Sequence, residues 1–410
     1  MKILQLAQFL PPMPGGEERH VWTLATALAA RGHQVTLLGF AAGGEGPGEI
    51  TSEGVRVVRV RTAASRLSSI YTDTAVPHAP PVPDPVVIRA IHRELARGGF
   101  DVIHAHNWIV NSALGPAARA GVPVVMTLHD YSHFCATKRL MEHGKSTMCA
   151  GPSARRCLSC ASAHYGAIRG PITVAANAWT ARRRFEGVSR FLSVSGAVAT
   201  AVGDNAPLLR GATLSSEVVT NFIPDDIVLD QIPAPDRDAP LLYVGTLVGV
   251  KGVQVLLDAY ETLGGPPPLL LAGPAAPGTE WRFPEGAHWL GQTPRDELLN
   301  LYRTACAVIV PSVWSDPCPT VVLEAMAAGR PVIGASSGGI VDMVVDGVTG
   351  ILVPPGDVSA LAQAITALLI DPEAAKQMGR AGRDRAREFT VTAVVERIER
   401  VYASAISPCL

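Results

Sequence analysis

The chain has 410 residues, 48% of them hydrophobic and 17% charged, a composition that excludes extensive disorder and predicts a packed protein. Its formal net charge of −1 excludes the strongly basic surface of a typical nucleic-acid-binding protein. Met1-Lys2 leads directly into an apolar strand without the layout of a signal peptide, and no apolar run is long enough to span a bilayer. The sequence therefore predicts a cytoplasmic protein that is long enough for two domains.

The first half of the chain alternates between apolar strands and amphipathic helices. Residues 3–10 form the first predicted strand, a helix with one apolar face runs up to Arg31-Gly32-His33, and residues 35–38 form the next strand. Further strands are predicted within residues 55–60, 101–106, 122–129 and 191–195. Since a parallel strand reached by so short a connection needs a helical crossover, this half is expected to be a doubly wound sheet.

The second half repeats this alternation after residues 223–240, a segment rich in Pro and Asp that is typical of a linker. Strands are predicted at residues 241–244, 269–272, 308–310 and 331–333, with helices from Gly252 and from Thr320. We therefore predict an α/β protein with two Rossmann-like domains, residues 1–222 and 241–388, and a cleft between them. Residues 389–410 are predicted to be a final helix.

Two glycine-rich loops are candidate anion sites. Gly15 and Gly16 lie between the first strand and the first helix, where glycine lets a ligand approach the backbone and the helix N-terminus offers free N–H groups. A tight turn with positive φ is the alternative. Residues 245–252 contain Lys251 at a helix start, where the helix dipole disfavours a cation. An anion held between helix and ammonium would explain this lysine, and an exposed, solvated lysine is the alternative.

The most informative segment is residues 315–333. Asp316 precedes a predicted helix, which it could cap, and Glu324 lies about two turns inside that helix. Because Glu324 is surrounded by apolar residues, its carboxylate needs a hydrogen-bonding partner. The vicinal hydroxyls of a ribose would provide one.

These motifs together resemble a known family. Gly15-Gly16, the strand end Thr127-Leu128-His129-Asp130 and the segment from Asp316 to Pro331 are similar, in this order, to the signatures of retaining nucleotide-sugar glycosyltransferases of family 4, the glycogen-synthase-like group. The resemblance covers nearly the whole chain. It implies the GT-B fold, in which two Rossmann-like domains close on the donor and the C-terminal helix crosses back to the N-terminal domain.

The resemblance also implies roles for individual residues. Gly16, next to Gly15, would offer its N–H to the donor pyrophosphate, and His129 would line the sugar site near the reacting carbon. Lys251 would neutralise the pyrophosphate in place of a metal, so no cofactor is expected for catalysis. The remaining donor contacts would come from Asp316, from the backbone of Cys318, Pro319 and Thr320, and from Glu324 at the ribose hydroxyls.

Two residues depart from the family pattern. Asp316 replaces the usual Glu and is one methylene shorter, and Thr246 replaces the usual Arg, so half of the customary basic clamp at the donor is missing. The second departure leaves open a non-catalytic protein that binds nucleotide sugars.

A second group of candidate residues consists of histidines at neighbouring strand ends. His104 and His106 are expected at the same sheet edge as His129, which faces the ligand cleft of such folds. We favour His129 as the functional residue and His106 as a residue that supports it or faces the acceptor. The alternative is that one of the pair only supports loops through hydrogen bonds.

A polar insertion, residues 131–163, follows His129-Asp130 and is expected to shape the acceptor pocket. It contains four of the seven cysteines, Cys135, Cys149, Cys157 and Cys160. These could form a structural zinc site, a disulfide or reduced free thiols, and the spacing leaves the three alternatives open.

Further along, Arg182-Arg183-Arg184 lies near Trp179 and Phe185. A solvated helix face is the favoured interpretation of this run, and contact with anionic lipid is the less favoured one.

The sequence thus predicts transfer of a sugar from a UDP- or GDP-sugar to an acceptor that bears a hydroxyl or an amine. The acceptor class stays open among small molecules such as natural products, glycans and lipids. A sugar-nucleotide-modifying enzyme, such as a 2-epimerase, is the alternative activity. It would need acid–base carboxylates in the first domain, where the sequence offers no obvious pair.

Overall fold

The computed structural model describes residues 1–10, 15–41, 46–63, 78–144, 148–205, 216–231, 239–276 and 278–407. The chain divides into two compact units. Unit 1 comprises Met1–His143, Cys149–Thr220 and Val394–Leu410, and unit 2 comprises Gly144–Met148 and Asn221–Ala393. Residues 232–238 of the predicted linker lie outside the described residues.

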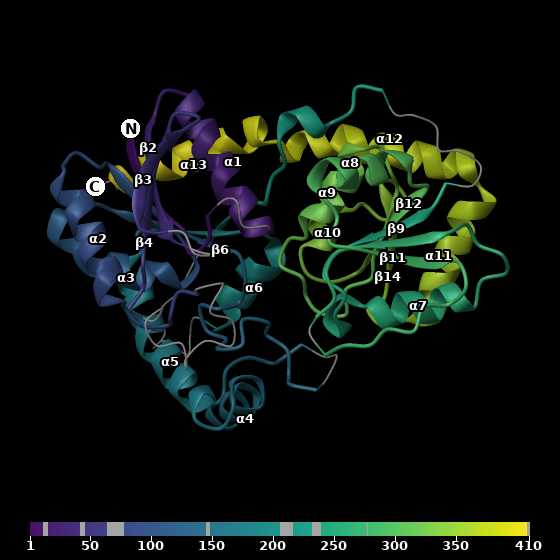
Figure 1. The fold of residues 1–410 in the computed structure, drawn as a ribbon, viewed down its shortest axis with the longest axis horizontal. Helices are drawn as coiled ribbons and strands as arrows, with labels where there is room; N and C mark the ends of the chain where they lie inside the picture. The colour runs from purple at the N-terminus through teal and green to yellow at the C-terminus, as the bar shows by residue number, and fades with distance from the viewer. Residues whose placement is uncertain are drawn as a thin grey trace. The chain divides into compact units, whose positions relative to one another are not determined.

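Unit 1 is built on an 8-stranded sheet with the order β3-β4-β2-β1-β5-β6-β7-β8 (Figure 1). Its neighbouring strands are parallel except for β3 and β4, which are antiparallel. The strands are β1 (Lys2–Leu6), β2 (Gln34–Phe40), β3 (Gly48–Ser52), β4 (Val55–Val60), β5 (Val102–His106), β6 (Val124–Leu128), β7 (Arg190–Ser193) and β8 (Ser216–Val218). The helices are α1 (Gly16–Ala30), α2 (Pro85–Ala96), α3 (Val110–Ala120), α4 (Ala154–Tyr165), α5 (Arg169–Gly187), α6 (Gly196–Asn205) and, from Val394 on, α13 (Val391–Ile406).

Unit 2 is built on a 6-stranded parallel sheet with the order β11-β10-β9-β12-β13-β14. The strands are β9 (Leu241–Val244), β10 (Leu269–Ala272), β11 (Ala287–Gly291), β12 (Ala307–Val310), β13 (Val332–Ala335) and β14 (Gly350–Val353). The helices are α7 (Val253–Glu261), α8 (Arg295–Thr304), α9 (Thr320–Ala327), α10 (Ile340–Met343), α11 (Val358–Ile370) and α12 (Pro372–Ala386). Two Rossmann-like sheets, parallel except for the pairing of β3 with β4, confirm the predicted fold class.

The central strands are apolar because helices cover both faces of each sheet. Every residue of β5, β6 and β12 is buried, as expected for parallel strands without a solvent-facing side. Edge strands lack this signal. The antiparallel strand β3 exposes four of its five residues, and the sequence did not predict it. The first strand also ends at Leu6 and not at residue 10, although residues 7–10 stay buried.

Helix α13 packs on unit 1 through side chains on its buried face. Tyr402 Oη lies 2.7 Å from Nδ1 of His104, inside β5. Glu399 accepts a hydrogen bond from Arg31 Nε (2.8 Å) and lies 2.8 Å from Nε2 of His33. These hydrogen bonds, with Arg31 contributing most, lower the pKa of Glu399 to about 2. The C-terminal helix therefore anchors to the beginning of the chain through buried and charged contacts.

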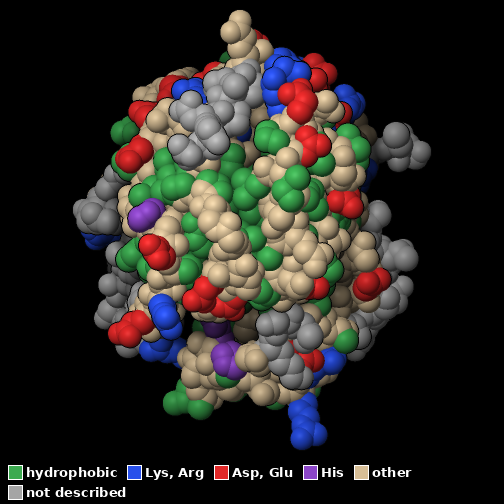
Figure 2. All heavy atoms as spheres, turned by 90° about the vertical axis from the view of Figure 1, so that its right-hand side faces the viewer, with side chains coloured by type: hydrophobic (Ala, Val, Ile, Leu, Met, Phe, Trp, Pro, Cys, Tyr) green, Lys and Arg blue, Asp and Glu red, His purple; other side chains and the backbone are tan. Residues whose placement is uncertain are grey.

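The surface of unit 2 carries an apolar groove beside α11. Its lining includes Leu263, Val358, Ala362, Ala367 and Ile370. In the view of Figure 2, which faces the side where Figure 1 shows α11, hydrophobic side chains gather on the face shown. Within the described residues no single helix has both the length and the apolar character needed to cross a membrane. The two helical segments Val358–Ile370 and Pro372–Phe389 have the required length and apolar character only when they are taken together. They are bent by 102° relative to one another.

Candidate functional site

The candidate residues fall into two groups, one in each unit, and both groups lie where the strand order reverses. In unit 1 the chain leaves β1 toward α1 while β5 lies beside β1 on the opposite side from β2. In unit 2 the strand β9 lies between β10 and β12. The carboxyl ends of strands at such a reversal are the ligand sites of open α/β sheets.

In unit 2 the loop after β9 is fixed against the loop after β12. Gly252 has a φ of +75°, and a Cβ at this position would lie 1.9 Å from the carbonyl oxygen of Pro311. The N–H groups of Val313 and Trp314 donate to the carbonyl of Val250 at 3.1 and 3.3 Å. Glycine is therefore required at position 252, because any side chain would push the two loops apart.

This arrangement places Lys251 against Asp316. The Lys251 ammonium donates to the Asp316 carboxylate, and it also lies 5.4 Å from the centre of the Trp314 ring. The Asp316 side chain is 7% exposed and that of Lys251 is 31% exposed, so the pair is only partly screened by water. Lys251 is thus not a solvated lysine, and the anion beside it in this structure is a carboxylate of the chain itself.

Asp316 does not cap the following helix. The residue before α9 is Pro319, which provides no side-chain cap, and Asp316 lies three residues further back. Its backbone is instead held by a glycine turn, in which the N–H of Gly339 donates to the Asp316 carbonyl at 2.8 Å. A Cβ on Gly338, which has a φ of +61°, would lie 2.1 Å from that carbonyl. The carboxylate is therefore free of capping and directed to Lys251.

Thr246 lies in the same loop and is exposed. Because threonine carries no charge, Lys251 is the cationic residue of the segment 245–252. Its carbonyl accepts a hydrogen bond from Tyr243 Oη at 3.0 Å. Burial, with the nearby Asp316 carboxylate, raises the pKa of Tyr243, so the phenol stays protonated and can keep this bond. Tyr243 thus holds the backbone of the loop in place through this hydrogen bond.

Glu324 is the fifth residue of α9, little more than one turn inside the helix and not about two. Its side chain is only 3% exposed, yet it has partners within unit 2: Arg295 Nη1 donates to Oε1 at 2.7 Å and Tyr302 Oη donates to Oε2 at 2.9 Å. Burial of this carboxylate therefore does not by itself require a ligand. The sequence prediction did not include either partner, although their spacing of seven residues places both on one face of α8.

Cys318, Pro319 and Thr320 form the entrance to α9. The Cys318 carbonyl accepts a hydrogen bond from Asn221 Nδ2 at 2.9 Å, and its sulfur lies 3.9 Å from Sδ of Met343. Burial raises the pKa of the Cys318 thiol to about 12. This thiol is therefore a packed side chain that stays protonated near neutral pH.

In unit 1 the two glycines begin α1 without a left-handed turn. Gly15 has a φ of 169°, which is extended backbone, and Gly16 is the first residue of the helix, so the tight-turn alternative is wrong. A Cβ on Gly15 would lie 1.9 Å from Oε2 of Glu18. The end of α1 that was expected to bind an anion is thus occupied by a carboxylate of its own first turn.

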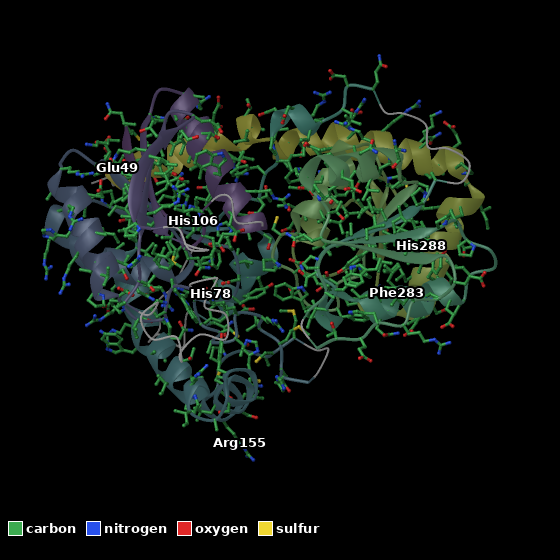
Figure 3. All side chains as sticks on the ribbon, viewed as in Figure 1. Glu49, His78, His106, Arg155, Phe283 and His288 are labelled. Carbon is green, nitrogen blue, oxygen red and sulfur yellow. The ribbon has the colours of Figure 1, made fainter. Side chains whose placement is uncertain are left out.

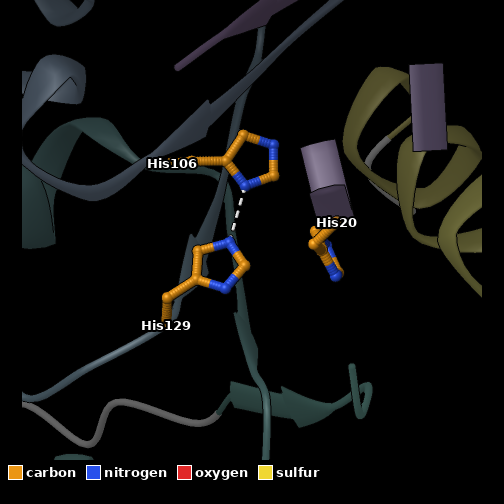
Figure 4. A group of neighbouring side chains, drawn as sticks. All are labelled: His20, His106 and His129. Carbon is orange, nitrogen blue, oxygen red and sulfur yellow. Dashed lines mark hydrogen bonds between the residues drawn. The ribbon is translucent and has the colours of Figure 1, made fainter. Parts of the chain in front are cut away.

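Three histidines meet at the carboxyl edge of the sheet (Figure 4). His106 ends β5, His129 follows β6, and His20 lies on α1. Nδ1 of His106 and Nε2 of His129 are 2.9 Å apart, and the ring centres of His20 and His129 are 4.8 Å apart. Burial lowers the pKa of all three, that of His129 to about 4, so the rings are neutral at pH 7.

Neutral imidazoles are metal ligands, and this is the one group of three or more whose ligand atoms lie within 4.8 Å of one another in the described part of the chain. The direct bond between His106 and His129 provides each with a partner without a metal. His104 has a different role, because its two ring nitrogens contact Tyr402 Oη and Thr127 Oγ1, both at 2.7 Å. It ties α13 and β6 to β5.

The four cysteines of the insertion are free thiols, so the predicted alternative of a disulfide between two of them is wrong. Burial, with smaller contributions from the neighbouring cysteines, raises the pKa of Cys149 and of Cys157. Cys160 Sγ accepts a hydrogen bond from the N–H of His143 at 3.3 Å. Among the residues that the structure describes, no three of these sulfurs come within 4.8 Å of one another, and the structural zinc site stays a prediction.

A polar pair that the sequence prediction missed lies near the histidines. Asn107 follows His106 with a φ of +60°, is buried, and donates from Nδ2 to Oε2 of Glu17 at 2.5 Å. Oε1 of Glu17 and Oδ1 of Asn107 are buried without a hydrogen-bonding partner among the described residues. Burial, then the carboxylates of Glu18 and Asp130, raise the pKa of Glu17 to about 8. Only the positive φ of a non-glycine residue marks this pair, and φ is not visible in a sequence.

The arginine run does not form a solvated face as a whole, because Arg184 is completely buried. Its guanidinium donates to the His133 carbonyl and to Asn177 Oδ1 at 2.7 Å each, and to Thr180 Oγ1 at 2.8 Å. Trp108 Nε1 also donates to the Ser132 carbonyl at 3.0 Å. Arg184 and Trp108 therefore hold the turn that follows His129-Asp130. Figure 3 shows His106 inside unit 1, in the part of the sheet that this turn adjoins.

Comparisons with known proteins point to one family. Residues 226–385 match the model of "Glycosyl transferases group 1", and residues 14–208 match "Glycosyltransferase Family 4". Glycogen synthase of Mycobacterium tuberculosis (strain ATCC 25618 / H37Rv) is 30% identical over 99% of this chain and 95% of its own. D-inositol 3-phosphate glycosyltransferase 1 of Catenulispora acidiphila is 28% identical over 88% of this chain and 93% of its own.

Solved structures agree on the fold. Sucrose-phosphate synthase from Thermosynechococcus elongatus superposes with a TM-score of 0.75 at 19% identity, covering 99% of both chains. Anabaena HepE in complex with UDP-glucose superposes with a TM-score of 0.67 at 19% identity, covering 98% of this chain and 100% of its own. At this identity the likeness establishes the arrangement of the strands and helices.

Proposed function

Because the chain belongs to the glycosyltransferases of group 1 and family 4, we propose that it transfers a hexose, with retention of the anomeric configuration, from a UDP- or GDP-sugar to an acceptor with a hydroxyl or an amine. The observation that carries this proposal is the ion pair of Lys251 and Asp316 at the reversal point of the unit 2 sheet. HepE, whose structure contains UDP-glucose, supports a nucleotide sugar as the donor class.

Lys251 supplies the positive charge that the leaving nucleoside diphosphate needs. Breaking the bond between sugar and diphosphate leaves negative charge on the phosphate oxygens, and an ammonium held in place stabilises that charge without reorganisation. The diphosphate competes with Asp316 for the ammonium. Once displaced, the Asp316 carboxylate is able to accept hydrogen bonds from the hydroxyls of the transferred sugar. Lys251 thereby replaces a metal ion, so transfer is expected to need none.

Glu324 is placed to bind the ribose of the donor. Its two oxygens accept hydrogen bonds from Arg295 and Tyr302, and a carboxylate can also accept from hydroxyl donors such as those of a ribose. Arg295 and Tyr302 orient the carboxylate and keep it from rotating.

The candidate residues of unit 1 are His129 and the pair of Glu17 and Asn107. The neutral His129 ring, held by His106, is proposed to contact the sugar, as the family resemblance implies. The partner-free oxygens of Glu17 and Asn107 offer an acceptor two fixed hydrogen-bonding positions. Because the pKa of Glu17 is raised to about 8, it is protonated at neutral pH and donates as well as accepts.

One observation supports a second activity, a sugar-nucleotide 2-epimerase. Such an enzyme needs acid–base carboxylates, and the carboxylates of Glu18 and Asp130 lie close enough to Glu17 to raise its pKa. The raised pKa of Glu17 is suited to a general acid near neutral pH. The sequence pattern gave no sign of this group, because Asp130 is more than a hundred residues from the other two.

The test combines donor identification with product analysis. Thermal unfolding is measured with a panel of UDP- and GDP-sugars, since a donor at a hundred times its Kd stabilises by about 2.7 kcal/mol. The stabilising donor is then incubated with candidate acceptors, with and without EDTA, and products are identified by NMR. A transferase releases the nucleoside diphosphate and forms a glycoside with the donor's anomeric configuration. An epimerised sugar, or no stabilising donor in the panel, would contradict the proposal.

A further inference from the structure

Helix α4 is attached to unit 1 with little apolar burial. Of its 12 residues only Ala161 is buried. The backbone at this point lies against α5 (Figure 1), because a Cβ on Gly170 would lie 2.4 Å from the carbonyl carbon of Ala161. A surface helix is ordinarily held by an apolar stripe of about three or four residues in every two turns, which α4 lacks. Another attachment for this helix is therefore expected.

Two cysteines occupy one face of α4 where an apolar stripe would be expected. Cys157 and Cys160 are three residues apart, and side chains at this spacing are neighbours on a helix surface. Both residues are half-buried. Cys157 is the fourth residue of the helix, where the positive end of the helix dipole favours a thiolate over a thiol. This face of α4 thus presents two potential metal ligands.

Two hydrogen bonds tie the loop that carries Cys135 to this helix. Tyr165 Oη, on the last residue of α4, donates to the carbonyl of Ala136, directly after Cys135, at 3.0 Å. Further along the same loop, the N–H of His143 donates to Cys160 Sγ at 3.3 Å. A backbone N–H directed at a sulfur stabilises the thiolate form of that sulfur. The first of the four cysteines is therefore held near the helix that carries the last two.

The loop that carries Cys149 is tied to the start of α4. Arg156 Nη2 donates to the carbonyl of Gly151, two residues after Cys149, at 3.1 Å. The N–H of Cys149 donates to the carbonyl of Leu140 at 2.8 Å, so this loop is also bound to the loop before it. Cys135 and Cys149 therefore approach α4 from two hydrogen-bonded loops, and all four cysteines belong to unit 1.

The pKa values of the cysteines show that the four thiols act on one another. Burial raises the pKa of Cys157 most, and the charges of the other three cysteines raise it further. Burial also raises the pKa of Cys149, with further contributions from Cys135 and Cys160. A reactive or catalytic cysteine has a lowered pKa, so these values speak against such a role. Neighbouring thiols that oppose one another's ionisation are stabilised as thiolates by a cation.

We propose that these side chains bind one zinc ion as four thiolates, in a site made of Cys135, Cys149, Cys157 and Cys160 that fixes α4 to the loops before it. On binding, each sulfur releases its proton to solvent and forms one bond to the metal, and no atom changes its oxidation state. Four cysteine ligands are typical of a structural zinc site and leave no open position for a substrate. Arg156, whose charge favours the thiolate of Cys149, offsets part of the negative net charge of the site.

Metal binding draws the four sulfurs together. No three of them, all in described residues, lie within 4.8 Å of one another in this structure. Sulfurs around a tetrahedral zinc ion, each about 2.3 Å from the metal, are about 3.8 Å apart. Two of the sulfurs now have other contacts, since the Cys149 thiol donates to the Gly151 carbonyl at 3.3 Å and Cys135 Sγ lies 3.4 Å from Thr137 Oγ1. Rotation of these two side chains exchanges one weak hydrogen bond each for a bond to the metal.

The test is the zinc content of the full chain, produced with zinc in the medium, freed of any affinity tag and dialysed against zinc-free buffer. Elemental mass spectrometry is expected to find about one zinc ion per chain. C157S/C160S removes two ligands and is expected to bind zinc at least about a hundredfold more weakly in competition with a chromogenic chelator. C306S is the matched control, because Cys306 is a half-buried cysteine of unit 2, and it is expected to retain the metal. Stripping the zinc is expected to lower the Tm of the unchanged chain and of C306S, since the metal binds the folded site preferentially.

Four other results would overturn the proposal. An unchanged chain without zinc does so even if C157S/C160S fails to fold. Zinc that C157S/C160S retains lies elsewhere, and His20, His106 and His129 are then the candidate ligands. Iron in place of zinc overturns the identity of the metal. Titration of the denatured, chelator-treated chain is expected to find seven thiols, and two fewer would show a disulfide. None of these measurements uses a donor or an acceptor, so failure of the proposed transfer reaction leaves their outcome unchanged.

Discussion

Replacing Glu324 with Ala is expected to destabilise unit 2 whether or not Glu324 binds a nucleotide. The substitution removes the acceptor of the Tyr302 hydroxyl, whose residue is completely buried, at a cost of about 1–3 kcal/mol. It also breaks the ion pair with Arg295, whose side chain is 32% exposed, which adds at most about 1 kcal/mol. A total of about 1–4 kcal/mol lowers the Tm by roughly 2–16 °C.

Replacing Glu324 with Gln separates this structural role from nucleotide binding. The amide oxygen still accepts from Tyr302, so the loss of stability is expected to stay below about 1 kcal/mol. If two ribose hydroxyls donate to the carboxylate, loss of its charge weakens nucleotide binding by about 1.5–3 kcal/mol, or roughly 10- to 150-fold in Kd. Calorimetric titration of the stabilising nucleotide measures this change.

Tyr302→Phe is the matched control. It removes the internal hydrogen bond but keeps the carboxylate and its pairing with Arg295. Nucleotide affinity is therefore expected to change by less than about threefold, while the Tm falls. Unchanged nucleotide binding in Glu324→Gln would refute the assignment of Glu324 to the ribose. Equal losses in Glu324→Gln and Tyr302→Phe would show that the pair acts only through structure.

Three further predictions concern other parts of the chain. Lys251→Met is expected to lower the rate of transfer by about a hundredfold or more, and single-turnover kinetics with a rate close to that of the unchanged chain would contradict its role at the diphosphate. The variant should also have a lower Tm, because the little-exposed Asp316 carboxylate loses its ammonium partner. The pKa of Glu17 is about 8 in the folded chain, above its ordinary value of 4.5. Between pH 4.5 and pH 8 the folded chain therefore keeps a proton on Glu17 that the unfolded chain releases. The free energy of unfolding falls as the pH rises through this range. Glu17→Gln should abolish this decrease in the free energy of unfolding, which is measured by urea unfolding at about pH 5 and pH 8.5. If the variant and the unchanged chain showed the same pH dependence, Glu17 would not be buried as described. Arg184→Met leaves the acceptors of a buried guanidinium without a donor and should lower the free energy of unfolding by about 3 kcal/mol or more. Arg183→Met should change the free energy of unfolding by less than about 1 kcal/mol. Equal effects of the two substitutions would contradict the different burial of the two arginines.

The sequence predicted the elements that position the site, because they carry strong local signals. Strands β4 and β9 have the predicted bounds, and α9 begins at the predicted Thr320. A strand buried on both faces must be continuously apolar, so its pattern is visible without knowledge of its neighbours. Edge strands and α8, whose exposed faces are polar, lack such a run and were missed.

The sequence by itself determined the family, the two α/β units and the segments that carry the candidate residues, because glycine, buried acids and strand ends leave a mark within a few neighbouring positions. Only the tertiary structure decided the partners. It pairs Lys251 with Asp316, which is 65 residues away in the chain, and Arg31 with Glu399, which is 368 away. It also places Arg184 inside the protein while Arg183 stays in water. Residue type shows that a charge needs a partner, but which partner it meets depends on how strands and helices far apart in the chain pack together, and that is a property of the folded protein alone.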